Sequence, residues 1–210
     1  MPFCVGLTGG IGCGKTSVSR LFAGLGADVV DTDEISHALT AAGGAAMGLI
    51  ESTFGADFIQ ADGALDRAAM RALVFADGAA KAHLEAILHP MIHARARIAV
   101  EQSTAPYTIL VVPLLLETGS YRDVINRVLV VDCDECLQIA RSMQRSGLTE
   151  AQVRAIMASQ LSRSARRAGA HDVLMNDGSR DDLLEQVYLL HQTYLAEAKK
   201  PARHANPLPE

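Results

Sequence analysis

A glycine-rich octapeptide near the beginning of the chain constrains the fold more than any other feature. It runs from Gly9 to Thr16 as GGIGCGKT and fits the pattern G-x-x-x-x-G-K-[S/T] of a phosphate-binding loop. Glycines let the backbone curl so that successive N–H groups converge on phosphate oxygens. Lys15 can reach the β- and γ-phosphates, and the Thr16 hydroxyl can ligate Mg²⁺. The octapeptide therefore predicts a site for a nucleotide polyphosphate and Mg²⁺.

The neighbouring residues supply the structural context that such a loop requires. Phe3–Thr8 is a short apolar run that predicts a buried strand, and Lys15–Gly26 has apolar residues at helical spacing. The helix would add the positive end of its dipole to the phosphate site. A simple glycine turn between strand and helix would not explain the adjacent Lys15 and Thr16.

Further strands alternate with helices along the chain. They are expected at Asp28–Asp31, Tyr107–Val112, Arg127–Asp132 and Asp172–Met175. This alternation predicts an α/β fold with a parallel sheet covered by helices on both faces. Ligands bind such sheets at the carboxyl ends of the strands. The residues expected at that edge are Thr8, Asp31, Asp33, Pro113 and Asp132.

The remaining segments are mostly helical. Glu34–Gln102 has helical periodicity interrupted by Gly43-Gly44, Gly55 and Asp62-Gly63, which predicts an inserted subdomain of several helices. Three further helices are expected. One covers Asp134–Arg145, one begins after Thr149, which would cap it with Gln152 in the third position, and one covers Asp181–Lys199. The tail Pro201–Glu210 contains three prolines and is expected to be disordered.

Charge and hydropathy exclude several classes of protein. The net charge of -5 argues against a nucleic-acid binder. The segment from Arg141 to Arg167 is locally basic, with six arginines and one acidic residue, which indicates either an anion partner or a solvated helix face. The longest apolar run, Ile109–Leu116, is too short to span a bilayer, and the first residues lack signal-peptide features. A cytoplasmic protein without membrane contact is expected.

The four cysteines are expected to be free thiols. They are Cys4, Cys13, Cys133 and Cys136. Cys133-Asp-Glu-Cys136 is a lone CxxC without the second ligand pair that zinc would need. A redox pair is an alternative, but two incidental cysteines at a strand–helix junction are the favoured interpretation.

The loop alone does not separate a kinase from a GTPase or an ATP-driven motor. No asparagine precedes a lysine, and no D-x-x-G occurs, so a guanine-nucleotide switch is disfavoured. Asp132 ends an apolar run but is followed by Cys133 rather than by the glutamate typical of a motor.

A carboxylate after the strand beside the loop favours a kinase, because it can accept the proton of an attacking hydroxyl. Asp31 and Asp33 share a face if the chain is extended, so either could be the base and the other could accept a hydrogen bond from water bound to Mg²⁺. Alternatively, Asp33 caps a helix beginning at Glu34.

A set of motifs covering Phe3 to about Leu195 resembles the dephospho-CoA kinase family. They are LTGGIGCGKT (Leu7–Thr16), DTD (Asp31–Asp33), His89-Pro90, PLLLE (Pro113–Glu117), RVLVVD (Arg127–Asp132) and QLSRSAR (Gln160–Arg166). The loop is shared by many families, whereas the order and spacing of the other motifs is far more specific. This family transfers a phosphate from ATP to the ribose 3′-hydroxyl of dephospho-CoA.

The resemblance implies a three-layer P-loop kinase core with a five-stranded parallel sheet, an inserted helical substrate-binding domain and a helical lid. The core would comprise residues 1–33, 104–145 and 169–200. Residues 34–103 would bind the CoA substrate, and residues 146–168 would form the lid. The substrate would be dephospho-CoA and the cofactors ATP and Mg²⁺, in a monomer or weak homo-oligomer.

The resemblance also implies roles for individual residues. Asp33 would be the general base and Lys15 the second catalytic residue, with Thr16 as the Mg²⁺ ligand. The nucleotide would be held by Gly10, Ile11, Gly12, Cys13, Gly14, Lys15, Thr16, Arg141, Asn176 and Gly178. The acceptor would be held by Thr8, Asp33, Arg67, His89, Glu117, Arg163 and Arg166. A capped or core histidine at a helix break is the alternative for His89.

Two positions depart from the family pattern. Met175 replaces an aspartate before Asn176, which weakens the assignment of an adenine-edge loop there. Cys13 stands where serine is common, and only its backbone N–H is needed for phosphate binding. Two alternatives to the family function remain: a P-loop kinase for another small alcohol or nucleotide, and an ATP-binding regulator without enzymatic activity.

Overall fold

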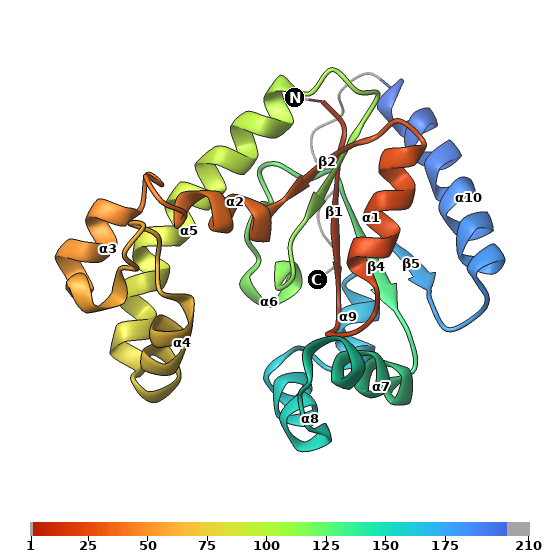
Figure 1. The fold of residues 1–210 in the computed structure, drawn as a ribbon. Helices are drawn as coiled ribbons and strands as arrows, with labels where there is room; N and C mark the ends of the chain where they lie inside the picture. Colours follow the sequence, from red (N-terminus) through yellow and green to blue (C-terminus); the bar gives the residue numbers. More distant parts are fainter. Residues whose placement is uncertain (1, 201–210) are drawn as a thin grey trace. The chain divides into compact units, whose positions relative to one another are not determined.

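The protein is built around a five-stranded sheet, seen here in a computed structural model that describes residues 2–200 (Figure 1). The predicted tail at 201–210 lies outside the described residues. The strands are β1 (Cys4–Gly9), β2 (Asp28–Asp31), β3 (Thr108–Val111), β4 (Arg127–Asp132) and β5 (Asp172–Met175). Their order is β2-β3-β1-β4-β5, so β1 lies at the centre. The bounds of β2, β4 and β5 are those predicted, and β1 and β3 differ by one residue at each end.

The sheet is parallel, as predicted. β1 pairs with β3, placing Leu7 opposite Val111, and with β4, placing Gly9 opposite Val131; β4 pairs in the same sense with β5. The carboxyl ends of these strands therefore meet at one edge. This is the edge at which the glycine-rich loop leaves β1.

Both faces of the inner strands β1, β3 and β4 are buried, which explains the continuous apolar runs of these strands. On one face, Leu7 and Leu129 belong to a buried cluster with side chains of α1 (Lys15–Gly24) and α10 (Arg180–Ala198), among them Phe22 and Val187. On the other face, Gly6 lies against Leu115 of α6 (Leu115–Thr118) and Ile125, and α9 (Arg163–Ala168) contacts β4. Helices on both faces give the predicted three layers.

The chain divides into two compact units. One comprises the described residues up to Val30 and from Ala99 onward, and the other is Asp31–Ile98. The second unit contains α2 (Thr32–Leu39), α3 (Met47–Phe54), a 3₁₀ turn η1 (Ala56–Phe58), α4 (Arg67–Ala76) and most of α5 (Gly78–Gln102). Its own core is formed by Leu39, Ala46, Met47, Ile50, Leu65 and Met70. The predicted domain limits at 34 and 103 stay a prediction.

Glycines separate the helices of the second unit where the sequence indicates breaks. Gly43, Gly55 and Gly63 all have positive φ angles, and Gly55 follows the last residue of α3. The alternative for His89, a histidine at a helix break, is wrong, because α5 is continuous through Pro90. A proline inside a helix removes one backbone hydrogen bond without having to end the helix. His89 is exposed, so it is not a core histidine either.

Two helices follow β4 in the first unit. They are α7 (Glu135–Ser146), capped by Asp134, and α8 (Glu150–Ser159). The predicted cap of α8 is confirmed, because the Thr149 hydroxyl accepts from the N–H of Gln152 and the Gln152 side chain accepts from that of Thr149. No helix within residues 2–200 has the length and apolar character needed to cross a membrane.

Candidate functional site

The glycine-rich loop joins β1 to α1, as expected. The Lys15 Nζ donates to the carbonyl oxygens of Gly9 and Gly10, at 2.7 and 3.2 Å, so the ammonium group lies over the beginning of the loop. α1 starts at Lys15 without a side-chain cap and without an acidic residue in its first turn. Its first N–H groups and its positive dipole end thus suit an anion.

Two glycines in the loop are required by their conformation and by close neighbours. Gly12 and Gly14 have φ angles of 74° and 92°, which disfavour any residue with a Cβ. A Cβ on Gly12 would lie 2.7 Å from Ser142 Oγ of α7, and one on Gly14 would overlap Asn176 Nδ2. The loop is therefore packed closely against α7 on one side and against Asn176 on another.

Asn176 connects the end of β5 to the loop. Its Nδ2 donates to the carbonyl oxygen of Cys13 at 2.7 Å, and its own carbonyl oxygen accepts from Arg141 Nη1 at 2.8 Å. Three of the predicted nucleotide-binding residues are thus in direct contact. Gly178 lies two residues further on, exposed, just before the Ser179 cap of α10.

The segment between α8 and α9 is hydrogen-bonded to the loop and to Glu117. Gln160 Oε1 accepts from the backbone N–H of Ile11 at 3.1 Å, and Glu117 Oε1 accepts from the N–H of Leu161 at 3.1 Å. Glu117 Oε2 is buried and has no hydrogen-bond partner within the described residues. Sequence reasoning gave Gln160 no role of its own. Its position at the start of the Gln-x-x-Arg-x-x-Arg motif was the available signal.

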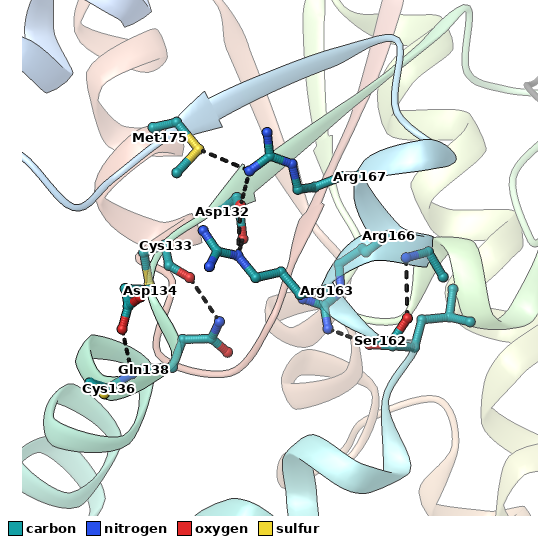
Figure 2. Close-up of polar contacts among 12 residues, drawn as sticks. Asp132, Cys133, Asp134, Cys136, Gln138, Ser162, Arg163, Arg166, Arg167 and Met175 are labelled. Carbon is teal, nitrogen blue, oxygen red and sulfur yellow. Dashed lines mark hydrogen bonds and ion pairs between the residues drawn. The ribbon is translucent and has the colours of Figure 1, made fainter.

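Asp132 holds two arginines of the predicted lid (Figure 2). Its carboxylate is 1% exposed and accepts from Arg163 Nε, at 2.9 and 3.0 Å to its two oxygens, and from Arg167 Nη1 at 3.0 Å. The hydrogen bond to Asp132 raises the pKa of Arg163. Sequence reasoning placed Asp132 at the strand end but missed this pairing. The signal was a strand-end aspartate combined with a nearby arginine-rich motif.

Arg166 is the buried arginine of the motif. It is 5% exposed and donates from Nη2 to the carbonyl oxygen of Leu161 at 2.7 Å. A Cβ built on Gly10 would lie 2.8 Å from Arg166 Nη1, so this guanidinium is next to the loop. A cavity of about 360 Å³ opens beside it. Its lining residues are Glu135, Gln138, Arg154, Met157, Ala158, Gln160, Leu161, Ser162, Arg163 and Arg166. The arginines make this a candidate anion-binding cavity.

Cys13 and Cys133 are buried free thiols whose side chains contact each other. The hydrogen bond from Cys133 and the nearby charges of Lys15 and Arg166 lower the pKa of Cys13 to about 7, against the opposing effect of burial. The same contact, together with burial, raises the pKa of Cys133. Cys13 is thus the more acidic thiol of the two.

Thr8 and Thr16 lie at the two ends of the loop. The Thr8 hydroxyl is fully buried and donates to the carbonyl oxygen of Pro113 at 3.1 Å, which connects the ends of β1 and β3. Thr16 is exposed in the first turn of α1. A hydroxyl oxygen there fits Mg²⁺, which prefers oxygen ligands and takes its others from phosphates and water. Residues 2–200 contain no cluster of three or more His, Cys, Asp or Glu side chains suited to a metal ion.

Asp33, Arg67 and His89 belong to the second unit. Asp33 lies in the first turn of α2, and the cap of that helix is Asp31, whose Oδ1 accepts from the N–H of Asp33 at 2.8 Å. The alternative that Asp33 is the cap is therefore wrong, and the two aspartates do not share a face of extended chain. Arg67 begins α4 and donates from Nη2 to the Thr40 hydroxyl at 2.6 Å. Binding roles for Arg67 and His89 stay predictions.

The family model and the sequence relatives name one family. The family model described as "Dephospho-CoA kinase" matches residues 3–182. A relative of that name from Burkholderia thailandensis is 54% identical over 197 residues, which cover 93% of this chain and 97% of the relative. Among solved structures, TT1252 from Thermus thermophilus has a TM-score of 0.79 at 31% identity, covering 95% of this chain and 99% of the other. A dephospho-CoA kinase from Campylobacter jejuni has a TM-score of 0.68 at 24% identity, covering 92% and 98%, and supports the fold alone.

Proposed function

The chain belongs to the dephospho-CoA kinase family, and we propose that it transfers the γ-phosphoryl group of ATP to the ribose 3′-hydroxyl of dephospho-CoA. The products are coenzyme A and ADP. The observation that carries the proposal is the loop at Gly9–Thr16, fixed by Asn176 on one side and by Gln160 on the other. A loop fixed in this way binds phosphates with little reorganisation.

Each part of the loop has a role in binding ATP. The backbone N–H groups of Gly12–Thr16 and the start of α1 bind the phosphates, and Lys15 stabilises charge on the phosphoryl group in transfer. Thr16 holds Mg²⁺, which when bound neutralises charge on the β- and γ-phosphates. Arg141, Asn176 and the backbone at Gly178 form the adenine side.

Asp33 acts as the general base on the acceptor hydroxyl. A carboxylate can accept the proton of the attacking hydroxyl and orient it. Asp31 already caps α2, so Asp33 is not needed as the N-cap. Arg67 and His89, both in the inserted helical unit, bind the CoA part of the acceptor.

The lid arginines and Glu117 complete the site. Arg163 and Arg166 bring positive charge to the phosphoryl group, and closure of the lid, residues 146–168, excludes water and so prevents ATP hydrolysis. Glu117 lies near the reacting groups and accepts a hydrogen bond from the backbone of Leu161, so it also supports the start of the lid.

A panel of acceptors tests the proposal. The purified protein is incubated with Mg-ATP and, separately, with dephospho-CoA, adenosine, shikimate or a nucleoside monophosphate, and products are identified by mass. The proposal predicts phosphorylation of dephospho-CoA far above the others. Phosphorylation of another acceptor instead would favour the alternative of a kinase for a different small alcohol or nucleotide. ATP binding without any acceptor would favour a regulator.

A further inference from the structure

Gln160 has a hydrogen-bonding group that the functions assigned so far do not use. Its Oε1 accepts from the Ile11 N–H, and this is the one hydrogen bond of its side chain within the described residues. The orientation of the carboxamide is determined by that contact, because only the oxygen can accept from an N–H group. The Nε2 group, with two N–H donors, therefore points away from Ile11.

The contact between Gln160 and Ile11 lies at the end of the loop that faces the outer phosphates, that is, the β- and γ-phosphates of a bound nucleotide. A phosphate-loop lysine reaches the β- and γ-phosphates. Here Lys15 Nζ lies at 2.7 Å from the Gly9 oxygen and 3.2 Å from that of Gly10, so the beginning of the loop is the outer-phosphate end. Ile11 follows directly, and Gln160 is hydrogen-bonded to it.

The backbone around Gln160 is held in place. Its N–H donates to the carbonyl oxygen of Met157 at 3.1 Å as α8 ends, and the next residue, Leu161, donates to Glu117. Gln160 lines the same 360 Å³ cavity as Arg163 and Arg166. Donors of the carboxamide and of two guanidinium groups thus line one space beside the loop.

We propose that Gln160 contacts the terminal phosphoryl group of the bound nucleotide through Nε2, and so distinguishes ATP from ADP. This inference rests on the proposed function, because it needs a nucleotide in the loop. Gln160 then binds the phosphoryl group that is transferred and releases it once transfer is complete. The Ile11 N–H keeps the carboxamide in the orientation that presents its donors.

The test compares the affinities of two nucleotides. Dissociation constants for the non-hydrolysable analogue AMP-PNP and for ADP, both with Mg²⁺, are measured by calorimetry for the wild type, Gln160→Ala and Gln160→Glu. Hydrogen bonds to a charged group predict that Gln160→Ala weakens AMP-PNP binding about 10-fold or more and ADP binding less than about 2-fold. Gln160→Glu keeps an acceptor for Ile11 but replaces the donor by a negative charge, so its loss for AMP-PNP should be larger still.

Gln144→Ala is the matched control, because Gln144 is an exposed glutamine on α7 and does not line the cavity. It should bind both nucleotides like the wild type. Equal losses for AMP-PNP and ADP in Gln160→Ala, or no loss, would overturn the inference while the wild type still forms coenzyme A. A wild type that binds neither nucleotide would instead overturn the proposed function.

Discussion

The carboxylate of Asp31 accepts a hydrogen bond from the backbone N–H of Asp33 over 2.8 Å. This contact makes Asp31 the cap of α2 and places Asp33 inside the first turn of that helix. Two aspartates separated by one residue therefore have different structural roles. The division supports Asp33, rather than Asp31, as the base.

Replacing each aspartate by asparagine tests this division. Asp33→Asn should lower kcat about 10²-fold or more while leaving the affinity for ATP within about 2-fold, because it removes the proton acceptor and no phosphate contact. Asp31→Asn should keep kcat close to that of the wild type, since asparagine caps a helix as well as aspartate does. Steady-state kinetics and ATP binding check both. If Asp31→Asn is the inactive variant, the roles are reversed.

The loop should tolerate no side chain at Gly14. Gly14→Ala should bind Mg-ATP far more weakly, because its Cβ overlaps Asn176 Nδ2 and its φ of 92° strains alanine by about 1–2 kcal/mol. Adding Asn176→Ala should restore part of the affinity by removing the overlap but not the strain. Nucleotide titrations of the single and double variants measure this.

Gly24→Ala provides the control for that series. Gly24 ends α1, and a Cβ there meets nothing within 4 Å. Alanine should therefore leave nucleotide affinity unchanged and raise the free energy of unfolding by up to about 1 kcal/mol. A loss of affinity in this variant comparable to that of Gly14→Ala would contradict the account of the loop.

Asp132 should contribute strongly to stability through its two arginines. Asp132→Asn removes the negative charge that Arg163 and Arg167 share, and charge-assisted hydrogen bonds predict a loss of about 1.5–3 kcal/mol in the free energy of unfolding. The lower part of that range is expected, because the arginine side chains are 29% and 47% exposed. Urea denaturation gives the value.

Asp134→Asn is the comparison for this prediction. Asp134 caps α7 by accepting from the N–H of Cys136, and asparagine retains that function. Its cost should be a few tenths of a kcal/mol. Equal costs for the two variants would show that the arginine pairing adds nothing to stability.

His171 should make the fold less stable in acid. Its Nδ1 accepts from the Val128 N–H at 3.0 Å, and burial, followed by the charge of Arg127, lowers its pKa. In the unfolded chain His171 takes up a proton near pH 6.5, whereas in the folded chain it does so only at a lower pH. The free energy of unfolding therefore falls as the pH drops from about 6.5 through the pKa of His171 in the folded chain.

The check compares free energies of unfolding at pH 7.5 and pH 5.5. In His171→Asn the decrease between these values should be smaller than in the wild type, because asparagine can still accept from Val128 and does not titrate. A residual decrease is expected from His191, whose pKa is also lowered by burial. Identical decreases in both proteins would exclude His171 as a source.

Local sequence patterns predict the sheet and the loop well, because both depend on neighbouring residues. The strand β4 is indicated by its own apolar run, and the loop by the glycines that follow β1, so each is determined by residues a few positions apart. Contacts between distant segments are not visible in this way. Asp132 meets Arg163 across 31 positions, and Ile11 meets Gln160 across 149. No periodicity encodes such a pairing.

Two alternatives that the sequence left open fail for local reasons. The helix α2 begins at Thr32, one residue before Asp33, so the cap moves to Asp31; helix ends are uncertain by one or two residues in any pattern-based prediction. A helix break at His89-Pro90 was the alternative for His89, yet α5 continues through Pro90, because the loss of one hydrogen bond is offset by the packing of the rest of a 25-residue helix.

The most direct test of the central claim is the initial rate at which the purified protein converts dephospho-CoA and Mg-ATP to products, with Lys15→Ala measured beside it. The account predicts equal amounts of ADP and coenzyme A, phosphorylated at the ribose 3′ position, and a large loss of both rate and ATP affinity in Lys15→Ala. ADP formed without coenzyme A, or a Lys15→Ala variant as active as the wild type, would contradict it.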